Sequence, residues 1–340
     1  MREALLWTPL PENRVQCALC SHYCRISDGD RGLCGVRENR GGRLLTLVDD
    51  QIAAANLDPI EKKPLYHFLP GTTSFSIGTM GCNLACGFCQ NWSLSQPPKE
   101  GKEIQGQRVT PAQLVATAQE LGAASLSYTY SEPTIFFELV QDTARLARDA
   151  GLANVLVSNG FMSPRCLEEL GPLIQAANID LKAFTERFYA EQCGARLKPV
   201  LDNLAHIRRL GWHLEVTTLV IPGLNDSDSE LADIAGFIAD RLGPDTPWHV
   251  SRFHPTYRLT DRGPTPVERL EAAWHMGHAA GLKYVYVGNV PGHDTNSTRC
   301  PQCGCVCIDR TGFTVRAQRL ADGHCPTCGA RVAGDFPPPA

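Results

Sequence analysis

The stretch TMGCNLACGFCQNW, residues 79–92, decides the fold, because it sets Cys82, Cys86 and Cys89 in C-x3-C-x2-C spacing directly after a short apolar run. Three thiolates this close together can ligate one face of a cubane iron–sulfur cluster. The run contains no fourth cysteine, so one iron is left without a protein ligand. Because structural metal sites are normally fully ligated by protein, the open position predicts a bound small molecule. A three-cysteine zinc site is the alternative.

Short apolar runs alternate with amphipathic stretches around and after this motif. We expect strands near residues 75–79, 125–130, 154–159, 177–181, 213–221, 248–253 and 283–288. Helices are expected near residues 111–122, 135–150, 199–210, 228–242 and 266–280. Such alternation is typical of parallel strands joined by crossover helices. Six or seven repeats predict an α/β fold, a partial or nearly closed TIM-like (β/α) barrel.

Two matching C-P-x-C-G knuckles lie near the C-terminal end, at Cys300, Cys303, Cys325 and Cys328. The sequence between them predicts a hairpin that turns at residues 309–312, so the unit resembles a zinc ribbon or a rubredoxin-like knuckle pair. Four thiolates saturate a tetrahedral ion, which indicates a structural role. Zinc is the expected metal, although a single iron fits the same four sulfurs.

A third cysteine group, Cys17, Cys20, Cys24 and Cys34, has C-x2-C-x3-C-x9-C spacing. Four sulfurs could hold zinc or a second iron–sulfur cluster, and the spacing does not separate the two. Because the group precedes the barrel, we favour a closed structural site over a redox site.

Composition changes along the chain predict four segments. They are a cysteine-rich metal-binding lobe with its connection (1–70), the barrel (71–296), a four-cysteine ribbon (297–333) and a disordered, proline-rich tail (334–340).

The overall composition excludes several classes of protein. A net charge of −4 over 340 residues gives no electrostatic reason to expect a nucleic-acid partner. No apolar run reaches the length of a membrane span, and the first residues lack the apolar core of a secretory signal. We therefore expect a cytoplasmic protein, in which fifteen cysteines favour metal binding over disulfides.

The central motif, with Phe88 before its last cysteine, resembles the signature of the radical S-adenosylmethionine (SAM) superfamily. The resemblance implies a [4Fe-4S] cluster at Cys82, Cys86 and Cys89, with SAM chelating the open iron. One electron from the cluster would cleave SAM to methionine and a 5′-deoxyadenosyl radical, which abstracts hydrogen from a substrate. A barrel mouth would shield that radical from solvent.

The resemblance extends to the ends of the predicted strands. Glu132, in YSEP, would meet the cofactor's ammonium, although this chain lacks the two glycines of the family's Gly-Gly-Glu-Pro pattern. Ser158-Asn159-Gly160 is similar to the Thr-Asn-Gly of the activating-enzyme branch. Asp180-Leu181-Lys182 is similar to a motif of pyruvate formate-lyase activating enzymes whose acid and lysine reach the cofactor. His254 falls where the same branch carries a histidine that contacts the ribose.

The order of these motifs along nearly the whole chain resembles the radical enzyme of the AmmeMemoRadiSam system. This resemblance implies Memo-like and AMMECR-like companion proteins and a low-potential electron donor such as flavodoxin or ferredoxin. Relatedness to activating enzymes implies a protein or peptide substrate. The alternatives are a radical enzyme acting on a small molecule and, in another class, a non-catalytic iron–sulfur or zinc scaffold.

Overall fold

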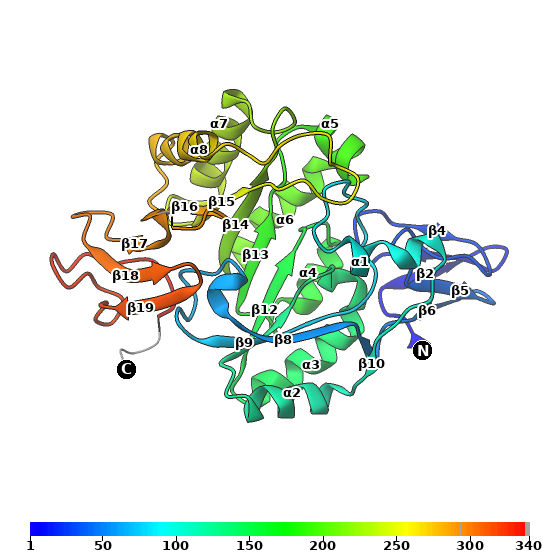
Figure 1. Cartoon of the computed structure of the whole chain (residues 1–340). Coiled ribbons are helices and arrows are strands. Elements are labelled where there is room, and N and C mark those ends of the chain that lie inside the picture. Colours follow the sequence, from blue (N-terminus) through cyan, green and yellow to red (C-terminus); the bar gives the residue numbers. More distant parts are fainter. Residues whose placement is uncertain (293, 337–340) are drawn as a thin grey trace.

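A computed structural model describes residues 1–292 and 294–336. The chain builds a β-rich N-terminal lobe, a central α/β body and a small C-terminal ribbon, and the lobe and the ribbon lie on opposite sides of the body (Figure 1).

One eight-stranded sheet forms the centre of the molecule. Its parallel strands are β9 (Thr73–Gly78), β11 (Ser125–Tyr128), β12 (Ala153–Ser158), β13 (Ala176–Asp180), β14 (His213–Val220), β15 (Trp248–Arg252) and β16 (Val285–Gly288). Strand β8 (Ala54–Pro59) pairs antiparallel with β9 and forms one edge, and β16 forms the other. All seven expected parallel strands are confirmed. Within the described residues the two edge strands are not paired, so the sheet is a partial barrel.

Helices cover the outer face of this sheet. The longer ones are α2 (Pro111–Glu120), α3 (Phe137–Asp149), α4 (Pro164–Leu170), α6 (Leu197–Leu210), α7 (Asp228–Phe237) and α8 (Val267–Ala279). The capping box of Thr110 and Gln113 begins α2, and Ser227 caps α7, as the sequence signals predict. Helix α3 buries its apolar stripe against β11 and β12, and α8 packs on β15 and β16.

The remaining helical turns are short. They are η1 (Ile60–Lys62), α1 (Trp92–Ser95), η2 (Pro97–Glu100), η3 (Pro133–Phe136), α5 (Glu186–Phe188), η4 (Tyr189–Cys193), η5 (Ile238–Leu242) and η6 (Asp294–Asn296). No helix within the described ranges is both long enough and apolar enough to cross a membrane.

The N-terminal lobe consists of small antiparallel sheets. Its strands are β1 (Arg2–Glu3), β2 (Trp7–Leu10), β3 (Arg14–Cys17), β4 (Arg25–Ile26), β5 (Arg37–Arg40), β6 (Arg43–Thr46) and β7 (Gln51–Ile52), which pairs with β10 (Gln107–Arg108). Because β8 joins the central sheet, the first 70 residues contribute one strand to the barrel as well as the lobe.

The connection after β8, residues 60–70, closes the base of the barrel, where the parallel strands begin. Its apolar residues Ile60, Leu65 and Phe68 pack against Val155 and Ala176 at the starts of β12 and β13. The opposite end of the barrel, at the carboxyl ends of the strands, is therefore the end available for a site.

Buried charges hold the connection in place. The carboxylate of Glu215, on β14, accepts the backbone N–H groups of Tyr66 and His67 and also bonds the rings of His213 and His249. The Glu215 side chain is fully buried, and these hydrogen bonds satisfy its carboxylate. They hold the connection against the base of the barrel.

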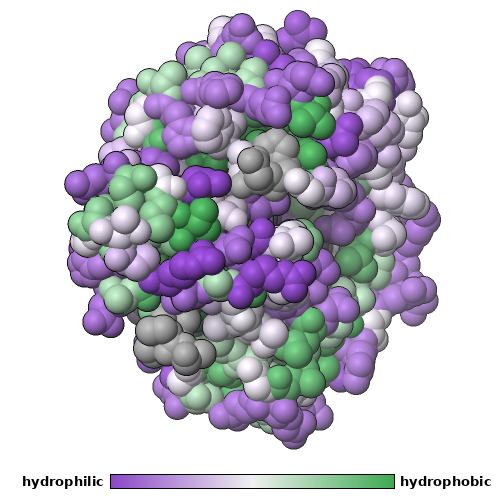
Figure 2. All heavy atoms as spheres, turned by 60° about the vertical axis from the view of Figure 1, so that its left-hand side comes forward, coloured by the Kyte–Doolittle hydropathy of each residue, from purple (hydrophilic) through white to green (hydrophobic). Residues whose placement is uncertain are grey.

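The ribbon consists of β17 (Thr298–Arg299), β18 (Val306–Thr311) and β19 (Thr314–Gln318). The predicted hairpin is present, but its turn lies at residues 312–313 and not at 309–312, because Asp309, Arg310 and Thr311 still pair with β19. The face of the molecule that carries the ribbon mixes hydrophilic and apolar residues (Figure 2). Residues 334–336, expected to be disordered, are placed: Asp335 pairs with Phe68 and exchanges backbone hydrogen bonds with His67 and Leu69. The composition of the tail does not indicate that its backbone pairs with that of residues 67–69. Residues 337–340 of the same expected tail lie outside the described residues.

Candidate functional site

A cavity of about 240 Å³ opens at the carboxyl ends of the parallel strands. It is lined by the cysteines of the central motif together with five of the predicted cofactor-contacting residues: Cys82, Cys86, Cys89, Glu132, Ser158, Asn159, Asp180 and Lys182. These side chains come from the loop after β9 and from the ends of β11, β12 and β13. The topology thus brings together residues that are up to 100 positions apart in the sequence.

Hydrogen-bond donors lie beside two of the three central sulfurs, those of Cys82 and Cys89. The Leu84 N–H lies 3.4 Å from the Sγ of Cys82, the Nδ2 of Asn159 lies 3.8 Å from the same sulfur, and Ser95 Oγ lies 3.3 Å from the Sγ of Cys89. Burial raises the pKa of Cys82, so this thiol is uncharged until a metal takes the place of its proton. Donors aimed at sulfur stabilise thiolates bound to metal.

Asp180 and Lys182 form an ion pair at the cavity wall, with 2.7 Å between Asp180 Oδ2 and Lys182 Nζ. Burial opposes the charged form of Lys182, but the Asp180 carboxylate keeps the pKa of Lys182 well above its usual value. Asn225 fixes this strand end, because its Nδ2 donates to the backbone oxygens of Lys182 at 2.6 Å and Leu219 at 2.8 Å. Asn225, in the VIPGLND run at residues 220–226, therefore positions the lysine through the backbone.

Glu132 links the ends of two neighbouring strands. Its Oε1 accepts hydrogen bonds from Ser158 Oγ at 2.8 Å and Thr134 Oγ1 at 2.5 Å, and its Oε2 accepts the Asn159 N–H at 2.8 Å. Burial raises the pKa of Glu132 even though these bonds favour the carboxylate. The side chain is 1% exposed. Glu132 and Ser158 thus hold the strand ends together, and the Nδ2 of Asn159 contacts the Cys82 loop through Asn83 Oδ1 at 2.8 Å.

His254 is the one predicted cofactor-contacting residue that does not line this cavity; its side chain is exposed after β15. Its place along that edge is taken by Ser251 and Asn289, whose Nδ2 donates to Ser251 Oγ at 3.0 Å. The sequence held a signal for both. Ser251 is a polar residue at the end of a buried strand, and Asn289 directly follows β16.

The lining fits a polar ligand next to a metal cluster. Ser131 Oγ is buried at the cavity and has no hydrogen-bond partner in the structure, so it is available to a bound molecule. Three thiols can ligate an iron–sulfur cluster, and an ion pair and an unpaired hydroxyl can bind its zwitterionic organic ligand.

The four C-terminal cysteines converge as the knuckle pattern predicts. Their ligand atoms all lie within 4.8 Å of one another, with 3.6 Å between the sulfurs of Cys300 and Cys328 and between those of Cys303 and Cys325. This group is closed by its own sulfurs, and Cys305 and Cys307 are not part of it. The N-terminal cysteines Cys17, Cys20, Cys24 and Cys34 line a different, small cavity in the lobe.

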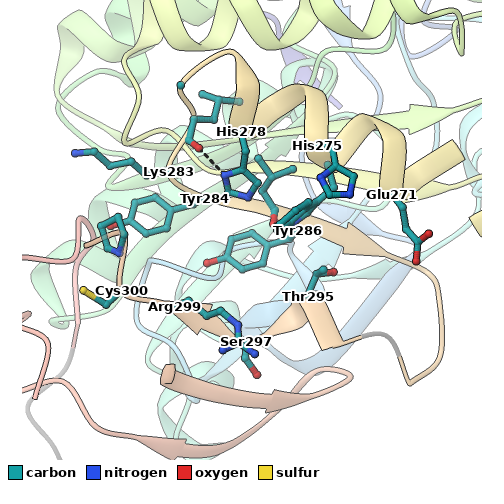
Figure 3. A pocket seen from close by; sticks show the side chains of 15 residues that line it. Glu271, His275, His278, Lys283, Tyr284, Tyr286, Thr295, Ser297, Arg299 and Cys300 are labelled. Atoms are coloured by element: carbon teal, nitrogen blue, oxygen red, sulfur yellow. Dashed lines mark hydrogen bonds between the residues drawn. The ribbon is translucent and has the colours of Figure 1, made fainter. Parts of the chain in front are cut away.

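A larger cavity, about 740 Å³, lies between α8, β16 and the ribbon (Figure 3). The rings of Tyr284, Tyr286 and His278 line it. Trp274 Nε1 donates to the Val285 carbonyl at 3.0 Å, which covers part of the free edge of β16. The one thiol in its lining, Cys300, belongs to the ribbon group, so the reactive groups are concentrated in the smaller cavity.

Comparison with known proteins agrees with this geometry. The Radical SAM superfamily profile matches residues 76–235. An uncharacterized protein of Methanocaldococcus jannaschii is 42% identical over 334 residues, covering 98% of this chain and 99% of that protein. The chain belongs to the Radical SAM superfamily. Membership in the Radical SAM superfamily implies a [4Fe-4S] cluster and SAM as cofactors.

Two further similarities place this radical SAM protein among its relatives. The 4-hydroxyphenylacetate decarboxylase activating enzyme of Clostridioides difficile is 22% identical over 179 residues, covering 48% of this chain and 55% of that enzyme. The crystal structure of Streptococcus suis SuiB bound to S-adenosylmethionine is 14% identical, with a TM-score of 0.51, over 65% of this chain and 51% of that one. The latter similarity shows the radical SAM fold alone.

Proposed function

We propose that this radical SAM enzyme abstracts hydrogen from a protein or peptide partner, with the cluster at Cys82, Cys86 and Cys89. The observation that supports this most is the single cavity that joins the three thiols to the Asp180–Lys182 pair at the barrel mouth. When bound, a reduced cluster supplies the electron that cleaves SAM and so provides a 5′-deoxyadenosyl radical for hydrogen abstraction.

The chain's own residues have distinct roles in this proposal. Lys182 and Asp180 present both charges to a zwitterionic cofactor, so each can bind the opposite charge of the methionine part. Ser131 Oγ offers a hydrogen-bonding group that no protein atom uses. Glu132, fully hydrogen-bonded, keeps the ends of β11 and β12 in register and so orients the cavity wall.

The open sheet supports a polypeptide substrate. Because β8 and β16 are not paired with each other in the described part of the chain, the sheet does not close between them, and an extended segment could approach the mouth from that side. The similarity to an activating enzyme favours the same class. The resemblance to the AmmeMemoRadiSam system makes Memo-like and AMMECR-like proteins the first candidates, with a flavodoxin or ferredoxin as electron donor. Fifteen free cysteines suit the reducing cytoplasm.

The decisive experiment measures SAM cleavage by the reconstituted, reduced enzyme and then adds each candidate partner in deuterated form. The expected result is 5′-deoxyadenosine that carries deuterium only when the true partner is present. Deuterium from a small metabolite instead would favour the small-molecule enzyme, and the absence of any SAM cleavage would favour the scaffold. A Cys86→Ala variant is the negative control, and Cys166→Ala, at a buried cysteine outside the three groups, is its matched counterpart.

A further inference from the structure

The four N-terminal cysteines enclose one internal cavity. Cys17 ends β3, Cys20 and Cys24 lie in the turn before β4, and Cys34 precedes β5. All four are free, three are buried, and the surface between them is nearly all apolar. Four thiols that converge on an apolar enclosure without forming disulfides are typical of a metal site.

The spacing of the sulfurs separates this group from the ribbon. A single ion with metal–sulfur bonds of about 2.3 Å requires its four sulfurs to lie roughly 3.8 Å apart. In the part of the chain that is described, only the ribbon group brings three or more ligand atoms within 4.8 Å of one another. The N-terminal sulfurs surround their cavity, but no three of them lie within 4.8 Å of one another. The same is true of the sulfurs of Cys82, Cys86 and Cys89. Sulfurs stand farther apart when each bonds a different metal atom of a polynuclear cluster.

A buried cation lies beside the N-terminal cavity. Arg37, which is 1% exposed, lines the cavity and has its Nη1 3.9 Å from Cys17 Sγ. Its Nη2 pairs with Glu138, and its Nε has no hydrogen-bond partner in the structure. Four thiolates around a cluster carry net negative charge, and a fixed guanidinium offsets the cost of burying it.

The same cavity adjoins the central motif. Asn83, the residue after Cys82, lines it, and the Asn83 carbonyl oxygen lies 2.8 Å from the His22 Nε2. On its other side Asn83 is bonded to Asn159, which also contacts Cys82 Sγ. Asn83 therefore belongs to the wall of the N-terminal cavity and directly follows Cys82, a proposed ligand of the central cluster.

We propose that Cys17, Cys20, Cys24 and Cys34 hold a second iron–sulfur cluster of the cubane type, which relays electrons to the central one. A low-potential one-electron donor protein reduces the N-terminal cluster by one electron. That cluster is reoxidised when the electron moves to the central cluster, and no bond or proton changes place. The relay rests on the proposed function, whereas occupancy of the site does not.

Occupancy is tested by iron, sulfide and zinc analysis with Mössbauer spectra of anaerobically reconstituted protein. The triple variant Cys82→Ala, Cys86→Ala, Cys89→Ala leaves the lobe intact and should retain about four irons with a cubane spectrum. Retention of zinc without iron, or of no metal beyond the ribbon ion, would overturn the proposal. Because this variant cannot cleave SAM, its metal content is independent of whether the proposed function is right.

The relay is tested with Cys24→Ala, compared with Cys166→Ala as the control. Reduction of the central cluster by reduced flavodoxin should slow by about tenfold or more in Cys24→Ala. Reduction by titanium(III) citrate, which can reach the barrel mouth directly, should be unchanged and would also show that the barrel is folded. Equal rates with flavodoxin in both variants would overturn the relay.

Discussion

Lys182 Nζ lies 2.7 Å from Asp180 Oδ2, and the two side chains meet on the cavity wall because they are two residues apart at the end of β13. Asp180→Ala or Lys182→Ala leaves the partner's charge unpaired and removes one contact to the cofactor. We expect each variant to weaken SAM binding by about tenfold or more, which is roughly 1.4 kcal/mol, while the cluster's absorption spectrum is unchanged. Equilibrium binding with the reconstituted protein measures this.

A surface pair of similar geometry provides the control. Lys198 Nζ lies 2.8 Å from Asp202 Oδ2 on exposed positions of α6, and neither residue lines the site cavity. Lys198→Ala should leave SAM affinity unchanged. If Lys182→Ala behaves like Lys198→Ala, the β13 pair is a solvated ion pair and not a cofactor contact.

Cys86→Ala should abolish SAM cleavage and lower the iron content by about four atoms, because three cysteines are the smallest set that retains the central cluster. The metal content of the ribbon should be unaffected, since the two groups share no residue. Iron analysis and the 5′-deoxyadenosine assay check this. Full cleavage activity in the variant would contradict the ligand assignment.

Cys303→Ser should remove the ribbon's ion, because four sulfurs at this spacing leave no spare ligand. Limited proteolysis should then cut the segment after residue 297, which is too short to bury a core of its own. Uncoupled SAM cleavage should survive. Loss of the central iron together with the ribbon metal would show that the two parts depend on each other.

Arg310, on β18 of the ribbon, binds the connecting segment at residues 60–70. It pairs with Glu61 at 3.3 Å, donates to the Tyr66 carbonyl at 2.6 Å, and both charged side chains are fully buried. Arg310→Met leaves Glu61 as an uncompensated buried charge, so we expect a loss of about 3–5 kcal/mol in the free energy of unfolding. Denaturant unfolding measures it. The double variant Arg310→Met, Glu61→Met should recover much of the loss, and a failure to recover would contradict this explanation.

Stability should fall with acid between pH 6.5 and pH 4. Burial lowers the pKa of His67 from 6.5 to about 4, so in this window the unfolded chain binds a proton that the folded chain does not. The stabilisation is complete above pH 6.5 and is lost as the pH falls, by an amount on the order of 3 kcal/mol. Glu215 adds a loss of the same sign at lower pH, because hydrogen bonds from His213 and His249 outweigh its burial and hold its pKa well below the usual range.

Thermal unfolding at pH 7 and pH 5 tests this dependence. His67→Gln keeps a side chain that can hydrogen-bond to Tyr286 and the Ala333 carbonyl but does not titrate. The variant should show a flatter pH dependence than the parent chain. An unchanged dependence would assign the acid sensitivity to other groups.

Much of the barrel was predictable because its signals are local. The parallel strands are short apolar runs, and some of the helices between them begin at side-chain caps such as Thr110 and Ser227. The strand-end residues Asp180 and Lys182 could be placed together because parallel strands end at one edge. The helix α4 was missed, although Ser163 and Pro164 mark its start, because the helix is only seven residues long.

Other features depend on contacts that no local pattern records. His254 turns outward after β15, where Thr265 binds the backbone of Phe253 and redirects the chain. The ordered segment at residues 334–336 depends on backbone partners in the connection. The separation of the N-terminal sulfurs likewise arises from the fold of the lobe and could not be read from cysteine spacing.

The pairing of Phe68 with Asp335 also sets an order of events during synthesis. His67 bonds the Ala333 carbonyl across a sequence separation of 266, so the connection cannot complete its native contacts when it first leaves the ribosome. The lobe and the strands can form as they emerge, but the base of the barrel stays unfinished until residues 333–335 have been made. Until then the apolar side chains of Ile60, Leu65 and Phe68 have only part of their native contacts. A nascent chain that stalls before the ribbon has been made is therefore a candidate for chaperone binding.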